Sequence, residues 1–338
     1  VLKQNTEKSV KTILTEIWMQ PLSSEEKGFM YLDNFKVITK PYKGDNTKEI
    51  IIGKDINSNF DRHCMINQGD TLYYFTVADY NRKIKLFGQD TSVIDFDFYE
   101  WNSLTKKTTF LFSASDIIKD SMLVPQLFES DGIYNSVLDI YHWNWIQKVD
   151  NNKLLINFAF SGFLQYDLDT KKTDWYWCNN SSSFNSIKRK GSKSNPYYTH
   201  HLNQISTGPF KGYYSYFENG AIGDSAIPFK PALARIFKIN SQKNTLEIVF
   251  EKKFDVATMA MGSIDVAGNY VLVNLGMTTP IGGIMNKLEK SGKEGAVEYF
   301  KNYKHPQVYL YDLKGKEISN YVYPFGFYSY IAWLKKKN

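Results

Sequence analysis

Four of the five histidines stand at one recurring place in the sequence, and imidazole is well suited to nucleophilic and acid–base chemistry. His63 precedes the stretch CMINQGDTLYYF, and His142 precedes WNWIQKVDNNKLLINF. The pair His200 and His201 precedes LNQISTGPFKGYYSYF. A single histidine at the head of a strand is more often a packed core residue than a reactive group. Recurrence at one place in a repeat favours a shared site.

Asn144 adds an amide to this candidate site. It follows His142 by two residues, so in a strand both side chains point to the same side. Trp143 and Trp145 then point to the other side, into packing. A neutral imidazole is a competent nucleophile, and N–H donors stabilise negative charge that develops on an oxyanion. These residue types are compatible with nucleophilic chemistry at a shared site.

One unit returns several times along the chain: an apolar and aromatic run, a polar turn, and a second such run. The clear copies cover 93–112, 163–177, 234–254 and 307–325, with a weaker one at 31–52. A shorter strand pair precedes four of them, at 66–75, 149–158, 208–220 and 265–276. Two hairpins per unit make a four-stranded sheet. Radial stacking of such sheets buries their faces and leaves only short edges.

The sequence therefore predicts an all-β fold, a β-propeller of five or six blades. In a propeller, equivalent positions at the start of the innermost strands converge on the axial channel. We expect a helical segment over residues 1–27 and the propeller over 28–338. Helical spacing also predicts short insertions at 284–303 and at 114–128, the latter entered through Ser115 or Asp116.

Composition excludes several classes of function. The net charge of +6 is spread along the chain, which disfavours nucleic-acid binding. The two cysteines, Cys64 and Cys178, have no metal-ligand spacing, so we expect no metal and no cofactor. No apolar run reaches the ~18 residues of a membrane span. With four arginines in 338 residues, any oxyanion site must depend largely on other donors.

The stretches YHWNWIQKVDNNKLLINFAFSGFLQYDLDTKKTDW, DRHCMINQGDTLYYF and HHLNQISTGPFKGYYSYFENG occur in an order that resembles a known family. ARIFKINSQKNTLEIVFE and the terminal VYLYDLKGKEISNYVYPFGFYSYIAW continue the similarity. The family is the bacterial aryl-sulfate sulfotransferases, which use phenolic sulfate esters as donors. The resemblance covers roughly residues 55–335.

That resemblance implies a six-bladed propeller whose channel takes a small-molecule aryl sulfate and a phenol. It implies a ping-pong reaction through a sulfo-histidine, in the periplasm or outside the cell. His201 is similar to the family's nucleophile, with His200 as the alternative, and His63, His142 and Asn144 are similar to its sulfate-binding residues. Further substrate-binding residues by the same resemblance are His200, Arg235 and Tyr330.

The sequence departs from the family at its arginines. Ala159 and Ile331 stand where the family has arginine, and near Leu233 the nearest arginine is Arg235, two residues on. Loss of such a donor typically lowers the rate by ~10² to 10³. The alternative hypothesis is therefore a non-catalytic extracytoplasmic propeller that binds a carbohydrate, peptide or protein. A polysaccharide hydrolase or lyase has weaker support, because no carboxylate pair recurs near the histidines.

Overall fold

Strands make up nearly all of the regular structure. The computed structural model describes residues 20–21, 28–33, 36–41, 48–52, 59–60, 66–68, 71–123, 133–134, 137–149, 152–178, 188–190, 196, 198–220, 230–240, 242–243, 245–260, 262–279 and 307–322. Within these ranges the helices are α2 (Ala114–Ile117) and the 3-10 turn η1 (Asp120–Met122), and every other element is a strand. The predicted all-β class is confirmed.

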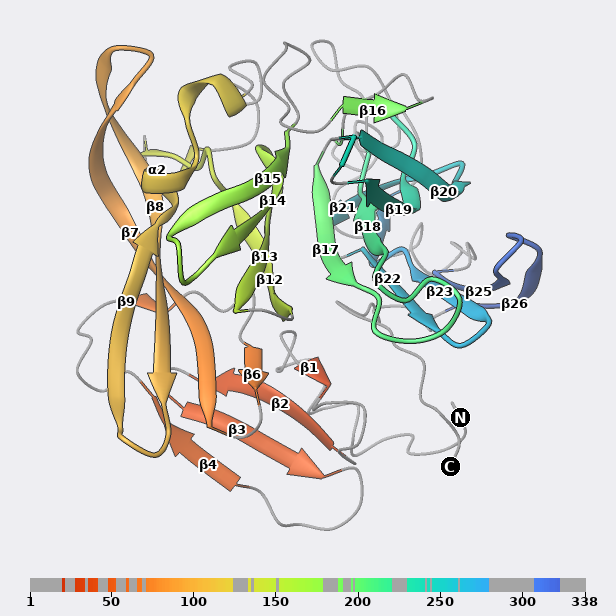
Figure 1. The fold of residues 1–338 in the computed structure, drawn as a ribbon, viewed down its shortest axis with the longest axis horizontal. Helices are drawn as coiled ribbons and strands as arrows, with labels where there is room; N and C mark the ends of the chain where they lie inside the picture. The colour runs from red at the N-terminus through yellow and green to blue at the C-terminus, as the bar shows by residue number, and fades with distance from the viewer. Residues whose placement is uncertain are drawn as a thin grey trace, which may run out of the picture.

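Five mainly antiparallel sheets follow one another along the described chain, here called blades 1 to 5 (Figure 1). Blade 1 contains β1 (Gln20–Pro21), β2 (Gly28–Asp33), β3 (Lys36–Pro41) and β4 (Lys48–Ile51). Blade 2 contains β5 (Asn59–Phe60), β6 (Ile66–Gln68), β7 (Leu72–Leu86), β8 (Gln89–Asn102), β9 (Lys107–Ser113), β10 (Ile133–Tyr134) and β11 (Val137–Leu138). Blade 3 contains β12 (Trp143–Val149), β13 (Lys153–Phe158), β14 (Gly162–Asp167) and β15 (Lys172–Trp177).

Blade 4 contains β17 (Thr199–Gln204), β18 (Tyr214–Glu218), β19 (Leu233–Asn240) and β20 (Thr245–Lys253), with β16 (Lys188–Lys190) parallel to β20. Blade 5 contains β22 (Ser263–Ala267), β23 (Tyr270–Asn274), β25 (Val308–Asp312) and β26 (Glu317–Tyr321). A separate pair is formed by β21 (Ala257–Ala260) and β24 (Met277–Thr279). Blades 3 and 5 keep the sequence order of their strands, which is the meander of a propeller blade.

One early strand of each of blades 2 to 4 lies against an early strand of the next blade. Strand β12 contacts both β6 and β17, and β17 also contacts β22. In Figure 1 these strands lie on the sides where blades 2 to 5 face each other. Consecutive four-stranded meanders with their first strands in contact constitute a β-propeller. Blade number and the 1–27 boundary stay predictions, because residues 1–19, 280–306 and 323–338 lie outside the described ranges.

Two of the predicted hairpins are confirmed in their places, whereas the strand pair expected at 208–220 contains one strand, β18, whose partner β17 ends at Gln204. The hairpin expected at 163–177 is β14 and β15, and the one expected at 234–254 is β19 and β20. The turn of the first hairpin forms because Asp167 Oδ1 accepts the N–H groups of Asp169 and Thr170, while Lys171 takes a positive φ of 54°. Aspartate and the left-handed residue thus fix the register of blade 3.

The helix expected over 114–128 begins at Ala114 but is shorter than predicted, because it ends at Ile117. Helix α2 follows Ser113, whose N–H donates to Asp116 Oδ2 at 3.0 Å. Ser113 and Asp116 are three residues apart, as in a capping box, so the chain enters the helix through Ser113 and not through Ser115 or Asp116. Residues 124–128 lie outside the described ranges. No helix among the described residues is long and apolar enough to cross a membrane.

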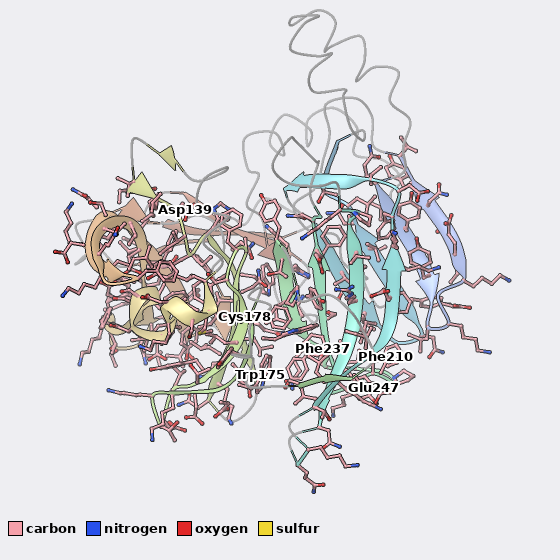
Figure 2. All side chains as sticks on the ribbon, turned by 90° about the horizontal axis from the view of Figure 1, so that it is seen from above. Asp139, Trp175, Cys178, Phe210, Phe237 and Glu247 are labelled. Carbon is pink, nitrogen blue, oxygen red and sulfur yellow. The ribbon has the colours of Figure 1, made fainter. Side chains whose placement is uncertain are left out.

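Blades 3 and 4 share a buried aromatic junction. Phe163 of β14 packs against Trp177 of β15 at 5.3 Å between ring centroids, and against Tyr216 of β18 and Phe237 of β19 at 5.0 and 5.6 Å. Tyr214 of β18 links Trp175 and Phe237, which are labelled in Figure 2, at 5.3 and 5.2 Å between ring centroids. Each such pair contributes about 0.5–1.5 kcal/mol beyond the burial of its area. The junction therefore fixes blades 3 and 4 relative to each other.

We expect Gly162→Ala to destabilise this junction more than the matched change Gly212→Ala. Both glycines have positive φ, 96° and 84°, so alanine at either costs roughly 1–2 kcal/mol in backbone strain. At Gly162 a Cβ would lie 2.3 Å from the Trp177 carbonyl oxygen, whereas at Gly212 nothing lies within 4 Å. Overpacking costs a further roughly 1–3 kcal/mol. Urea unfolding measures the difference, and equal losses would contradict the packing described.

Candidate functional site

The candidate residues fall at the starts of two neighbouring first strands. His142 directly precedes β12, Asn144 is the second residue of β12, and His200 and His201 are the second and third residues of β17. Because β12 and β17 are in contact, the fold brings these segments together. His63 and Tyr330 lie outside the described residues.

Backbone hydrogen bonds show which positions of the two blades correspond. The carbonyl of His142 accepts the Ala159 N–H, and the carbonyl of Tyr198 accepts the Asn219 N–H, both at 3.0 Å. His142 and Tyr198 also share positive φ values of 36° and 49°. The counterpart of His142 in blade 4 is therefore Tyr198. His200 and His201 lie further along their strand than the sequence repeat predicts.

Both first strands carry a β-bulge at the candidate residues. In β12, Trp143 pairs with Phe158 and Trp145 with Asn157, so Asn144 is the extra residue. In β17 the register shifts between His200 and Asn203, and within this bulge His201 has a φ of 55°. Left-handed non-glycine residues cost of order 1–3 kcal/mol and cluster at functional sites, as bulges do.

His201 is sealed among the first strands of three blades. Its ring lies 4.3 Å from that of Trp145 in β12, and Asn203 Nδ2 lies 2.9 Å from its Nδ1. The residue is 3% exposed. Burial lowers the pKa of His201 from 6.5 to about 3, against the opposing effect of a hydrogen bond with the backbone of Ile264 in β22. His201 is therefore neutral at pH 7.

Asn144 belongs to a buried amide network that joins blades 3 and 4. Its Nδ2 donates to the Thr199 carbonyl of β17 at 2.9 Å, and its Oδ1 accepts from Asn157 Nδ2 at 2.6 Å. Asn157 Nδ2 also donates to the Thr199 carbonyl, at 2.8 Å. Asn144 and Asn157 are both 0% exposed. Asn144 thus holds two blades together, whereas the sequence predicted an oxyanion donor.

Among the predicted site histidines that the structure describes, His142 is the one whose ring reaches solvent. Its side chain is 29% exposed, and its Nδ1 lies 2.6 Å from Asp139 Oδ2. The ring also lies 5.1 Å from that of Phe160, which is stacked on Tyr198 at 5.3 Å. A carboxylate, an imidazole and two aromatic rings therefore meet at the start of β12. Figure 2 shows Asp139 well away from Trp175 and Phe237 at the aromatic junction.

Arg235 is engaged within blade 4. Its Nη1 donates to Tyr216 Oη at 3.0 Å and to Glu218 Oε2 at 2.9 Å, and its Nε donates to Glu251 Oε2 at 2.6 Å. The arginine and Glu218 are both buried. Two carboxylates thus neutralise the guanidinium that the sequence predicted to bind substrate. At Ala159, which is fully buried, the side chain offers no donor.

Sequence reasoning missed Asp139, Phe160 and Tyr198. Asp139 precedes His142 by three residues, a spacing at which an aspartate side chain often accepts a backbone N–H. The sequence therefore contained a signal for Asp139. The aromatic pair gave no such signal, because Phe160 lies in the turn between β13 and β14 of blade 3 and Tyr198 directly precedes β17 of blade 4. Within the described ranges, no three His, Cys, Asp or Glu side chains gather closely enough to hold a metal ion.

No family model matches the chain, and no curated protein does. Among solved structures it is similar to the β-propeller domain of Cps50 (Swd1) from Myceliophteria thermophila, with TM-score 0.39 and 10% identity over 88% of this chain and 70% of that one. It is also similar to oligogalacturonate lyase in complex with manganese, with TM-score 0.41 and 7% identity over 86% of this chain and 61% of that one. At such low TM-scores the propeller assignment depends on the blades themselves.

We expect Asn144→Ala to destabilise the protein by about 1–3 kcal/mol, because it removes the acceptor of Asn157 and a donor to Thr199 inside the blade junction. Asn320→Ala removes an exposed amide that donates to Glu317, and should change stability by less than about 0.5 kcal/mol. Chemical denaturation of both variants is the measurement. Equal effects would show that the amide network does not hold the blades.

The lowered pKa of His201 predicts acid sensitivity. The pKa of His201 is about 3 in the folded state, against an ordinary value of 6.5. Its contribution to the free energy of unfolding is therefore complete above pH 6.5 and is lost as the pH falls toward 3. Between pH 7 and 5 this loss amounts to about 2 kcal/mol. His201→Gln should unfold with a flatter pH dependence than wild type, whatever its stability at pH 7. Parallel pH profiles would contradict burial of a neutral ring.

Proposed function

We propose that this β-propeller transfers a sulfuryl group from a phenolic sulfate ester to a phenol, by a ping-pong route through a sulfo-histidine. The observation that carries the proposal is the imidazole of His142, held by Asp139 and partly exposed at the start of a first strand. Aromatic rings beside it suit an aryl ligand, since Phe160 and Tyr198 are stacked there. We also propose that the protein works in the periplasm or outside the cell.

His142 is favoured over His201 as the group that receives the sulfuryl. A nucleophile must meet the sulfur atom, and the two residues differ in exposure, 29% for the His142 side chain against 3% for His201. The role of His201, which the family resemblance suggests as the nucleophile, then becomes the placement of β12, β17 and β22. Its neutral ring adds no charge to the blade junction.

The reaction divides into two displacements at sulfur. In the first, the Nε2 lone pair of His142 forms an N–S bond while the S–O bond to the aryl group breaks and the phenolate leaves with the electron pair. In the second, the oxygen of an acceptor phenol attacks the same sulfur, loses its proton to solvent and breaks the N–S bond. The imidazole is regenerated, and no oxidant, reductant or metal enters the balance.

A second candidate function is binding without turnover, to a carbohydrate, peptide or protein. The engagement of Arg235 by Glu218 and Glu251 favours it, together with the lack of a donor at Ala159. Oxyanion stabilisation is usually the largest single contribution to such catalysis, and each missing donor costs ~10² to 10³ in rate. Sulfuryl transfer by this chain is accordingly expected to be slow.

The test is release of 4-nitrophenol from 4-nitrophenyl sulfate with phenol as acceptor, followed by trapping with ³⁵S-labelled donor and peptide mapping. We expect acceptor-dependent release, label on the peptide containing His142, and loss of both in His142→Gln. The control is Asn320→Gln, an exposed site on β26. Label on His201 would move the nucleophile to that residue. If no 4-nitrophenol is released and no peptide is labelled, sulfuryl transfer is contradicted and the binding function is favoured.

A further inference from the structure

Both carboxylate oxygens of Asp139 bind the same residue. Oδ1 accepts the backbone N–H of His142 at 3.0 Å, and Oδ2 lies 2.6 Å from its ring nitrogen Nδ1. Asp139 is largely buried, with 9% of its side chain exposed. A single carboxylate therefore fixes the backbone and the ring of His142 together. The backbone contact also supports the left-handed φ of 36° at His142, a conformation that costs energy by itself.

The imidazole of His142 is contacted by an aromatic ring as well as by the carboxylate of Asp139. Phe160 lies 5.1 Å away at an interplanar angle of 44°, and Tyr198 stacks on Phe160 at 22°. Ala159, which precedes Phe160, donates its N–H to the His142 carbonyl and accepts the N–H of Thr199, the residue after Tyr198, so its backbone positions both aromatic neighbours. Carboxylate and aromatic contacts together leave one orientation of the imidazole.

This geometry determines which nitrogen carries the proton. A carboxylate can only accept, so at 2.6 Å from Asp139 Oδ2 the Nδ1 of His142 must donate. In the neutral ring the lone pair then resides on Nε2. We propose that Asp139 is a positioning residue that keeps neutral His142 in the Nδ1–H tautomer and so presents the Nε2 lone pair to the ligand. The consequence for rate rests on the proposed function, whereas the tautomer does not.

Asp139→Asn separates this role from a merely structural one. The variant is isosteric, but its amide has one accepting oxygen and one donating NH₂ group. Since the backbone N–H of His142 is always a donor, the amide oxygen must face it, and the NH₂ must face Nδ1. Nδ1 then has to accept, which moves the ring proton to Nε2. The shape of the site is kept while the reactive nitrogen loses its lone pair.

The experiment is ¹⁵N NMR of the histidine rings in the whole protein without ligand, with the His142 signals assigned from His142→Gln. We expect a protonated Nδ1 in wild type and a protonated Nε2 in Asp139→Asn. The matched control is Asp312→Asn, which removes the same charge from a turn where Oδ1 accepts the N–H groups of Lys314 and Lys316. It should leave the His142 tautomer unchanged. The same tautomer in wild type and Asp139→Asn would overturn the proposal.

The rate of sulfuryl transfer gives a second, independent test of the role of Asp139. Where wild type transfers sulfuryl groups, Asp139→Asn should be slower by up to about 10⁴-fold, the loss seen when a reactive histidine is held in the wrong tautomer. A change of tautomer with unchanged transfer would overturn the role of Asp139 in the reaction. A wild-type protein that shows the expected tautomer and no transfer contradicts the proposed function and supports the positioning of His142. The two failures are thus distinguishable.

Discussion

The arrangement of the candidate site depends on the hydrogen bonding of polar groups buried between blades 3 and 4. The Thr199 carbonyl accepts from the Nδ2 atoms of both Asn144 and Asn157, which lie on the first two strands of the preceding blade. The NH₂ groups of these buried amides need acceptors, because leaving a buried donor unsatisfied costs about 1–3 kcal/mol. This requirement sets the height of β17 against β12, and with it the relative places of His142 and His201.

The bulges in these strands serve the same junction. Asn144 enters the network because the bulge in β12 makes it an extra residue between the pairs at Trp143 and Trp145. In β17 a corresponding bulge and a left-handed φ accompany the burial of the His201 ring against Trp145. Backbone strain at these positions is compatible with stability because the surrounding aromatic packing fixes both strands.

Burial divides the predicted residues into two groups with different roles. Asn144, His201 and Arg235 are buried and bonded to protein groups, so they maintain the blades and their contacts. His142 remains partly exposed and is oriented by Asp139. An imidazole that is fixed and reachable can act on a ligand, whereas one that is fixed and sealed supports the scaffold. The chemistry proposed for this protein therefore centres on one histidine and its carboxylate.

The sequence by itself determined the strands, hairpins and propeller class, because alternating apolar runs and Asp or Asn turns act over a few residues. It also predicted His142 as a member of a candidate site, and it contained the three-residue spacing from Asp139 to His142. Only the tertiary structure decided that Tyr198 corresponds to His142, that His201 is sealed and that Glu218 and Glu251 engage Arg235. Bulges shift the register by one residue, and burial depends on which blade lies alongside, so neither follows from local pattern.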